Sequence, residues 1–138
     1  MFKVPKLTTK EVENLLHHAM PVTRGIKVES IETNRATIRL GYGDWMLRPG
    51  DTLSGPAIMT AADTAMYVLI LSHYGPELLA VTSTMNLNFL NKPVKGDLIA
   101  TAHFKKTGKR LVFCDVDVFS SAAKEAVAHV SGTYMMPS

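Results

Sequence analysis

The most constraining feature of this sequence is an apolar run over residues 54–74. Drawn as a helix, the run is apolar on nearly every side, so it must be buried all round rather than along one stripe. Ser54 is a typical helix N-cap, Pro56 is tolerated in a first turn, and Gly75 followed by Pro76 ends the run. We therefore predict a long central helix that the rest of the chain must cover.

The segments on either side of this run alternate between apolar and polar residues, as strands with one buried face do. Two short strands are predicted before the helix and four after it: 26–29, 36–40, 79–90, 97–106, 110–120 and 126–136. An amphipathic helix is predicted over residues 8–20, and a loop over residues 41–53. The order predicts an α+β fold, with an antiparallel six-stranded sheet wrapped around the central helix. Because one sheet covers only part of that helix, we expect a second copy of the chain to cover the rest.

Length and composition narrow the class of protein. The chain has 138 residues, 46% hydrophobic and 20% charged, which fits a single globular domain over residues 1–138. Cys114 is the single cysteine and cannot form an internal disulfide, so we expect a reducing, cytoplasmic compartment. The net charge of +3 comes without a basic run, so no nucleic-acid partner is expected. Polar residues interrupt the apolar run, so no membrane span is expected, and the absence of zinc-spacing and phosphate-loop motifs predicts neither a metal nor a bound cofactor.

Asp63 stands in the middle of the apolar helix and needs an explanation. Counted from Thr60, the residues Asp63, Thr64 and Tyr67 follow at helical spacings of three, four and seven, so the four make one polar stripe. A buried carboxylate is costly unless it is paired or hydrogen-bonded. It can be held by Thr60, Thr64 or a strand side chain and only fix the packing, or it can serve as a general base or nucleophile in a dry cleft. The residue pattern alone leaves both interpretations open.

The start of the same helix offers a second chemical group. Ser54 and Gly55 begin the helix and leave backbone N–H groups free to bind a carbonyl oxygen that gains negative charge. Gly55 and Asp63 are about 12 Å apart along one helix axis at about 1.5 Å per residue, so they cannot readily act on the same carbonyl. They can where two copies of the helix lie side by side in a dimer, which makes oligomerisation part of the chemistry.

Residues 55–65 read Gly-x-x-x-x-x-Ala-Ala-Asp-Thr-Ala and resemble the active-site helix of hotdog-fold acyl-CoA thioesterases of the PaaI and 4-hydroxybenzoyl-CoA type. Residues 84–96 are similar to the family's strand and loop near the coenzyme, and residues 107–110 to its next turn. The resemblance covers residues 22–136. It implies a hotdog fold, a homodimer or dimer of dimers, and hydrolysis of acyl-CoA, with coenzyme A as part of the substrate rather than a cofactor.

The resemblance also implies roles for residues. Asp63 would be the nucleophile or the base that activates water, and the Gly55 N–H would polarise the thioester carbonyl. The chain departs from the family pattern at three positions: Ser54 replaces the usual His, Pro56 the usual Gly, and Arg48 the usual Asn. Ser54 can still form a hydrogen bond near the thioester, but it cannot hold a positive charge.

Further candidates complete the predicted site. Thr64 joins Ser54, Gly55 and Asp63 in the catalytic group. The predicted substrate-binding residues are Arg48, Tyr67, Asn86, Asn88, Lys109 and Arg110. Asn86 and Asn88 are expected to share a strand face with Thr82 and Thr84, and the acyl pocket is expected to form from Met59, Met66, Tyr67, Tyr42 and Trp45.

Two other functions remain open on the sequence. Ser54 and Pro56 favour a non-catalytic hotdog domain that binds an acyl thioester as a sensor or carrier partner. A hotdog dehydratase or hydratase would place an Asp with a His at short spacing, and this sequence has no such pair.

Overall fold

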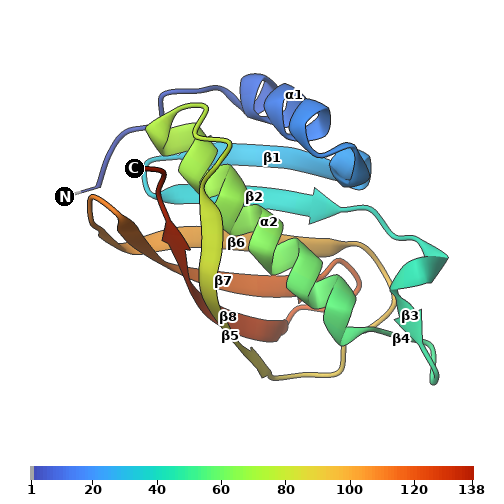
Figure 1. Cartoon of the computed structure of the whole chain (residues 1–138). Helices are drawn as coiled ribbons and strands as arrows, with labels where there is room; N and C mark the ends of the chain where they lie inside the picture. The colour runs from blue at the N-terminus through green and yellow to red at the C-terminus, as the bar shows by residue number, and fades with distance from the viewer. Residues whose placement is uncertain (1) are drawn as a thin grey trace.

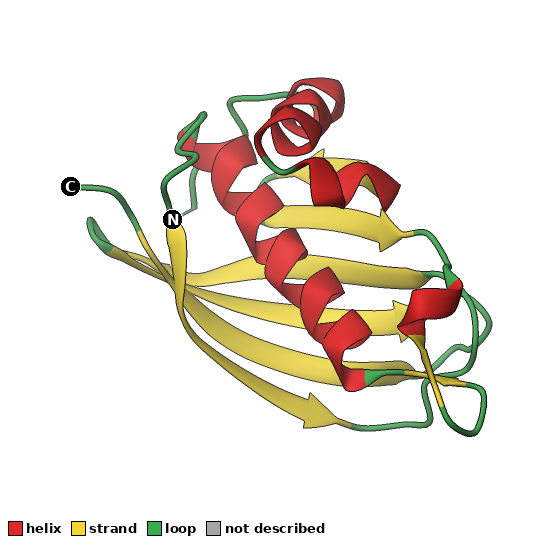
Figure 2. Cartoon of the chain, turned by 45° about the vertical axis from the view of Figure 1, so that its right-hand side comes forward, coloured by secondary structure: helices red, strands yellow, loops and turns green. Residues whose placement is uncertain are grey.

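The structure is a computed structural model that describes residues 2–138. In chain order its elements are α1 (Thr9–Ala19), the 3₁₀ turn η1 (Pro21–Gly25), β1 (Ile26–Glu32), β2 (Arg35–Leu40), η2 (Asp44–Met46), β3 (Leu47–Arg48), β4 (Thr52–Leu53), α2 (Gly55–Tyr74), β5 (Val81–Phe89), β6 (Leu98–Thr107), β7 (Leu111–Ser120) and β8 (Ala126–Met135). Six strands form one antiparallel sheet in the order β1-β2-β6-β7-β8-β5. The sheet curves around α2, which lies across its concave face (Figures 1 and 2).

Helix α2 forms the centre of the core. The Ser54 side chain accepts a hydrogen bond of 3.2 Å from the Ala57 N–H, and Gly75 ends the helix with a φ of 99° that favours glycine. From Ala61 to His73 every residue except Asp63 is buried. By length and composition α2 could cross a membrane, but 72% of its most apolar window is buried inside the domain, as in a core helix.

Helix α1 covers the β1 edge of the sheet. Thr8 and Glu11 form a capping box at its start, and Val12 and Leu16 are fully buried against the core. The Glu13 carboxylate accepts a hydrogen bond of 2.8 Å from the Val28 N–H, so a side chain of α1 satisfies a donor of the edge strand. The predicted N-terminal helix and six-stranded antiparallel sheet around a long helix are confirmed.

The segment before α2 is more ordered than the predicted loop. It contains η2 and the short β3–β4 pair, and Thr52 forms a bridge with Val94. Met46 and Leu53 are buried in the core, which fixes this turn-rich segment in place. The start of α2 is thereby anchored next to the sheet.

Strand β5 is the free edge of the sheet on the side opposite β1. Its pairing with β8 shifts between Thr82 and Thr84, so a bulge at Ser83 changes the strand's alternation. Thr82 pairs with Tyr134 and faces α2, whereas the Thr84 hydroxyl meets that of Thr133 at 2.7 Å on the outer face. The prediction that Thr82 shares a face with Asn86 and Asn88 is therefore wrong.

Candidate active site

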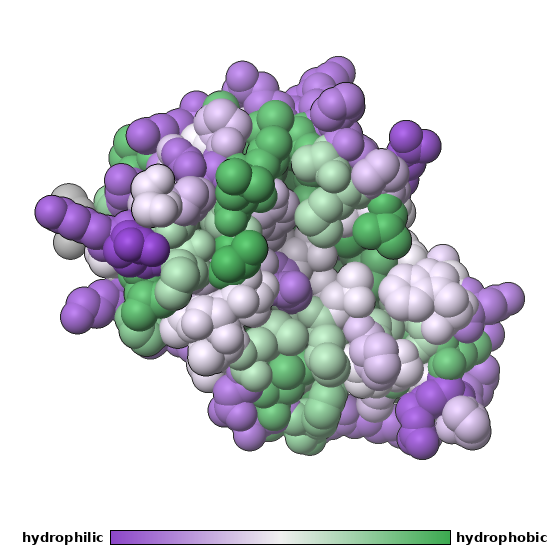
Figure 3. Space-filling view, viewed as in Figure 1, coloured by the Kyte–Doolittle hydropathy of each residue, from purple (hydrophilic) through white to green (hydrophobic). Residues whose placement is uncertain are grey.

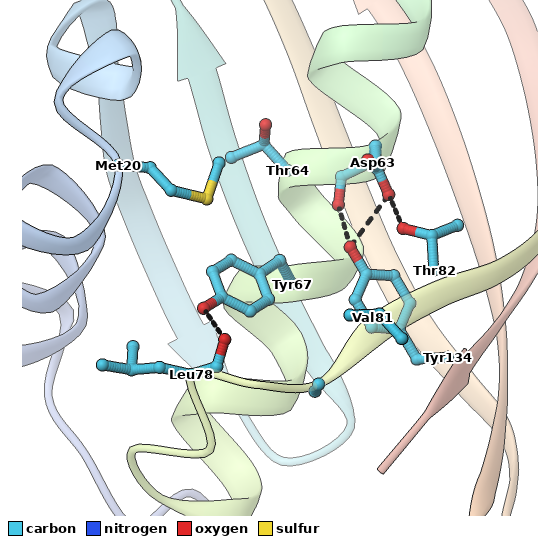
Figure 4. A pocket seen from close by; sticks show the side chains of 9 residues that line it. Met20, Asp63, Thr64, Tyr67, Leu78, Val81, Thr82 and Tyr134 are labelled. Atoms are coloured by element: carbon cyan, nitrogen blue, oxygen red, sulfur yellow. Dashed lines mark hydrogen bonds between the residues drawn. The ribbon is translucent and has the colours of Figure 1, made fainter. Parts of the chain in front are cut away.

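Asp63 is half-buried on α2 and points at the β5–β8 edge of the sheet. The Thr82 hydroxyl donates to its Oδ1 at 2.6 Å, and the Tyr134 hydroxyl donates to the same oxygen at 2.8 Å and to the Asp63 carbonyl at 3.2 Å (Figure 4). Charge-assisted bonds of this kind are stronger than neutral ones, so they hold the carboxylate in one orientation. Among residues 2–138, no hydrogen bond reaches Oδ2, which leaves that oxygen available for chemistry.

The Tyr134 hydroxyl serves as a donor over a wide pH range. Tyr134 is 3% exposed, and burial together with the Asp63 charge raises its pKa far above the usual value. Its ring stacks on that of Tyr67, with centroids 6.3 Å apart, and the Tyr67 hydroxyl donates to the Leu78 carbonyl at 2.7 Å. The two rings thus form a rigid wall beside Asp63.

Two hollows open beside Asp63. The reaction hollow, of about 300 Å³, is lined by Met20, Asp63, Thr64, Tyr67, Leu78, Ala80, Val81, Thr82 and Tyr134. The larger hollow, of about 560 Å³, is lined by Met20, Val22, Thr23, Gly25, Ile26, Leu40, Gly41, Trp45, Thr60, Asp63 and Thr64. Apolar residues gather around the recessed centre of this face of the molecule (Figure 3). A carboxylate with one free oxygen therefore lies between two cavities of ligand size.

The start of α2 presents a single free donor. Pro56 has no N–H, and the Ala57 N–H is already bonded to the Ser54 side chain. In the part of the chain that the structure describes, the Gly55 N–H has no acceptor. This arrangement leaves Gly55 as the one first-turn donor that can bind an incoming oxygen.

Comparison with known proteins decides the family. The sequence profile of the Thioesterase superfamily matches residues 50–127, which is more than half of the chain. A protein from Silicibacter sp. TM1040, provisionally named a thioesterase, is similar in structure with a TM-score of 0.89 and 31% identity over 97% of this chain and 94% of that one. This chain belongs to the Thioesterase superfamily. Its membership supports thioester hydrolysis as the activity.

More distant structures show the same fold. Zebrafish thioesterase superfamily member 2 has a TM-score of 0.80 at 23% identity, covering 96% of this chain and 100% of that one. The PaaI protein of the E. coli phenylacetic acid degradation operon has a TM-score of 0.76 at 22% identity, covering 95% and 97%. No curated protein sequence matches significantly. The predicted hotdog-fold thioesterase family is therefore confirmed.

Within this hotdog domain, part of the predicted site comes together around one point. Asp63, Thr64 and Tyr67 all line the reaction hollow. The Ser54 side chain caps α2, which is a structural role. Its predicted catalytic role stays a prediction. Gly55 lies two turns of α2 away from Asp63, as the helical spacing requires.

The predicted acyl pocket needs correction. Met66 is fully buried, and a side chain at Gly132 would meet its sulfur at 2.7 Å, so Met66 belongs to the helix–sheet core. The Tyr42 hydroxyl donates to Asp44 and lines neither hollow. Met59 is 40% exposed on α2 and lines neither hollow, whereas Trp45 does line the larger one.

The other predicted substrate-binding residues lie outside both hollows. Arg48 is exposed on β3, and Asn86 and Asn88 are exposed on the outer face of β5. Lys109 and Arg110 lie in the β6–β7 turn, at the end of the sheet near the C-terminus of α2 (Figure 1). One chain does not bring these residues to Asp63, so their role in binding stays a prediction.

The acidic residues of β7 belong to the outer face. Asp115 lies 3.3 Å from the Lys105 amine and 3.5 Å from His129, and Asp117 pairs with Thr101 and His129 across the sheet. Among residues 2–138, no group of three His, Cys, Asp or Glu side chains is placed to hold a metal ion.

Cys114 is buried on the core face, and burial raises the pKa of its thiol to about 12. The thiol is therefore not a nucleophile near neutral pH.

Sequence reasoning missed three residues of the site. Thr82 was assigned to the wrong face, because a bulge leaves no clear trace in the sequence. Tyr134 continues the inward-facing positions Val130 and Gly132 of β8, so strand alternation could have placed it beside the helix. Met20 follows α1 directly, and only the tertiary packing brings it to Asp63.

Proposed function

We propose that this protein hydrolyses acyl-CoA thioesters, with the Asp63 carboxylate as the reacting group. The observation that carries the proposal is that two hydroxyl donors hold Oδ1 of a carboxylate that lines a hollow, while among residues 2–138 no hydrogen bond reaches Oδ2. Family membership supports the reaction class, and the pattern of residues 55–65 supports an acyl-CoA substrate.

The free oxygen supports two routes to the same products. As a base, Oδ2 takes a proton from water while the resulting hydroxide attacks the thioester carbon. As a nucleophile, Oδ2 attacks that carbon itself, and water then hydrolyses the acyl anhydride. In both routes the C–S bond breaks, the coenzyme A sulfur leaves as thiolate and takes a proton, and the acyl group leaves as the acid. Water that attacks the anhydride at Asp63 Cγ leaves the Asp63 oxygen in the acid, so in ¹⁸O-labelled water a first product without label identifies the nucleophilic route. A first product with one labelled oxygen fits the base route and also an anhydride cleaved at the acyl carbon.

We further propose that the site is completed across a homodimer. The Gly55 N–H and the Asp63 carboxylate lie about 12 Å apart along one helix, which is too far for one carbonyl. Strand β5 is a free edge with exposed Val81 and Phe89, and Met59 is exposed on the adjoining side of α2. Exposed apolar edges of this kind are typical of pairing surfaces. Pairing of two β5 edges would bring Asp63 close to the partner subunit's Gly55, and its N–H would stabilise the oxyanion.

Steady-state hydrolysis of short-chain, medium-chain and aryl acyl-CoAs, followed with a thiol reagent, tests the proposal. Asp63→Asn should lower kcat by about 100-fold or more, because general-base groups contribute factors of about 10² to 10⁴. Asp117→Asn, on the outer face, is the matched control and should keep wild-type kcat. Full activity of Asp63→Asn would refute the proposed role.

A binding function without turnover is the second candidate. The observation that favours it is Pro56, which leaves the start of α2 with one free donor rather than two. Fewer donors stabilise an oxyanion less, so this chain could bind a thioester and hydrolyse it slowly. Tight binding of acyl-CoA by the wild-type protein, with no release of thiol, would support this candidate over hydrolysis.

A further inference from the structure

Asp97 joins three parts of the fold just before β6 begins. Its Oδ1 accepts the Tyr42 N–H at 2.7 Å, and its Oδ2 accepts a hydrogen bond from Arg39 Nη1 at 2.9 Å. Its backbone N–H donates to the Ser121 hydroxyl at 3.0 Å, and its carbonyl accepts the Ser121 N–H at 2.9 Å. The end of β2, the start of β6 and the end of β7 therefore meet at Asp97, which lines neither hollow.

The Asp97 carboxylate binds both donors as an anion. The Tyr42 N–H and the Arg39 guanidinium lower the pKa of Asp97, so the carboxyl group is charged near neutral pH. Arg39 is itself held from the other side, because its Nε donates to the Glu29 carboxylate at 3.0 Å. Charge-assisted bonds are about twice as strong as neutral ones. Asp97 is therefore a firm anchor for the Tyr42 backbone.

Tyr42 begins the segment that leads from β2 through β3 and β4 to the start of α2 (Figure 1). Within this segment, the Met46 N–H donates to the Gly43 carbonyl at 2.9 Å, and the Met46 side chain is fully buried. The Met46 carbonyl accepts the Ser54 N–H at 2.7 Å. Ser54 directly precedes Gly55, so a series of contacts leads from the anchored Tyr42 backbone to the first residue of α2.

The position of the Gly55 N–H determines how well it can stabilise an oxyanion. Such a donor acts at about 2.7–3.1 Å from the charged oxygen, and a misplacement of about 1 Å can lower a rate by about 100-fold. Pro56 has no N–H, so it cannot take over from a displaced Gly55. The start of α2 must therefore be held in place by the segment before it.

We propose that Asp97 is a positioning residue, which anchors the segment before α2 so that the Gly55 N–H is aimed at the thioester oxygen. This inference rests on the proposed function, in which that N–H stabilises the oxyanion. Asp97 acts through the Tyr42 backbone and does not touch the substrate. Its loss should therefore lower kcat and leave KM within a factor of about three.

Steady-state hydrolysis of acyl-CoA gives the first test. Asp97→Ala removes both acceptors and should lower kcat at least about tenfold. Asp97→Asn keeps one acceptor oxygen at the same volume, so its kcat should be at least about threefold above that of Asp97→Ala. Asp115→Ala is the matched control and should keep wild-type kcat, because it also removes a partly buried, ion-paired aspartate but lies on the outer face. Wild-type kcat in Asp97→Ala would overturn the proposal.

A double-mutant cycle with Gly55→Pro distinguishes positioning from a general loss of structure. The Gly55→Pro protein has no N–H at this position to displace, so adding Asp97→Ala should change its remaining kcat by less than about twofold. A further loss of about tenfold in the Gly55→Pro protein would show that Asp97 acts on other groups, and it would overturn the proposal.

Amide hydrogen exchange, followed residue by residue by NMR, gives a readout that needs no turnover. The Ser54 N–H should exchange at least about tenfold faster in Asp97→Ala than in the wild type, while the Leu69 N–H in the buried part of α2 should keep its rate. Unchanged exchange at Ser54, or equal acceleration at Leu69, would overturn the positioning role even where the wild-type protein hydrolyses acyl-CoA. Faster exchange at Ser54 alone, in a protein whose wild type hydrolyses no acyl-CoA, would refute the proposed function and keep Asp97 as the anchor of the start of α2.

Discussion

The Tyr134 hydroxyl donates a hydrogen bond of 2.8 Å to Asp63 Oδ1, although the two residues are 71 positions apart in the chain. The bond joins the centre of α2 to the inward face of β8. It fixes which carboxylate oxygen is occupied and which is free. The orientation of the Asp63 carboxylate is thus set by the sheet, while its position is set by the helix.

Removing this donor should impair catalysis more than binding. A hydrogen bond to a charged group contributes about 1.5–3 kcal/mol, so Tyr134→Phe should lower kcat by about 10- to 100-fold. KM should stay within a factor of about three, because we assign Tyr134 a positioning role. Tyr42→Phe is the matched control, since the Tyr42 hydroxyl bonds to Asp44 outside both hollows. An unchanged kcat for Tyr134→Phe would show that the bond does not serve the reaction.

The bulge in β5 gives a second, paired prediction. Thr82→Val removes the 2.6 Å bond to Asp63 and should lower kcat by about tenfold, whereas Thr84→Val removes a bond to Thr133 on the outer face and should leave kcat unchanged. The two substitutions are chemically identical and lie two residues apart. Rates that fall equally in both variants would contradict the placement of the bulge.

Part of the fold and of the candidate site could be predicted from the sequence, and part could not. The apolar run before Gly75 and the alternating segments were enough to predict the central helix, the six strands and the exceptional position of Asp63. The face of Thr82 could not be predicted. Strict alternation along β5 would put Thr82 on the same face as Thr84, but the extra residue Ser83 moves Thr82 to the opposite face. Met66 was misassigned for a different reason: a methionine on an all-apolar helix contacts core or cavity depending on the opposite strand, here at Gly132.

Stability should depend on pH through His73. His73 is fully buried, its Nδ1 lies 3.0 Å from the Leu69 carbonyl, and its Nε2 accepts the Asn34 N–H at 3.1 Å. Burial lowers the pKa of His73, and the backbone carbonyls of Leu69 and Glu32 offset this only in part. The unfolded chain therefore binds a proton first as the pH falls below about 6.5. The contribution of neutral His73 to the free energy of unfolding should be complete above that pH. It should decrease as the pH falls towards the lowered pKa.

Urea unfolding between about pH 8 and pH 5.5 measures this dependence. The midpoint should fall with pH in the wild-type protein, and His73→Gln, which cannot titrate, should lose that part of the slope. His18→Gln is the matched control, because His18 is exposed on α1. A slope that His73→Gln leaves intact would assign the pH dependence to other groups.

The proposed sharing of the site between two subunits predicts recovery of activity when two inactive variants are mixed. Gly55→Pro removes the proposed oxyanion donor, and Ser54 already has the extended backbone, φ −82° and ψ 157°, that a residue before proline prefers. Homodimers of Gly55→Pro and of Asp63→Asn should each have little activity. After unfolding and refolding together, half of the dimers would be mixed, and each of these would have one intact site, so the mixture should recover about a quarter of wild-type activity. Each variant refolded alone is the control, and a mixture that stays inactive would contradict a site shared between Asp63 of one subunit and Gly55 of the other.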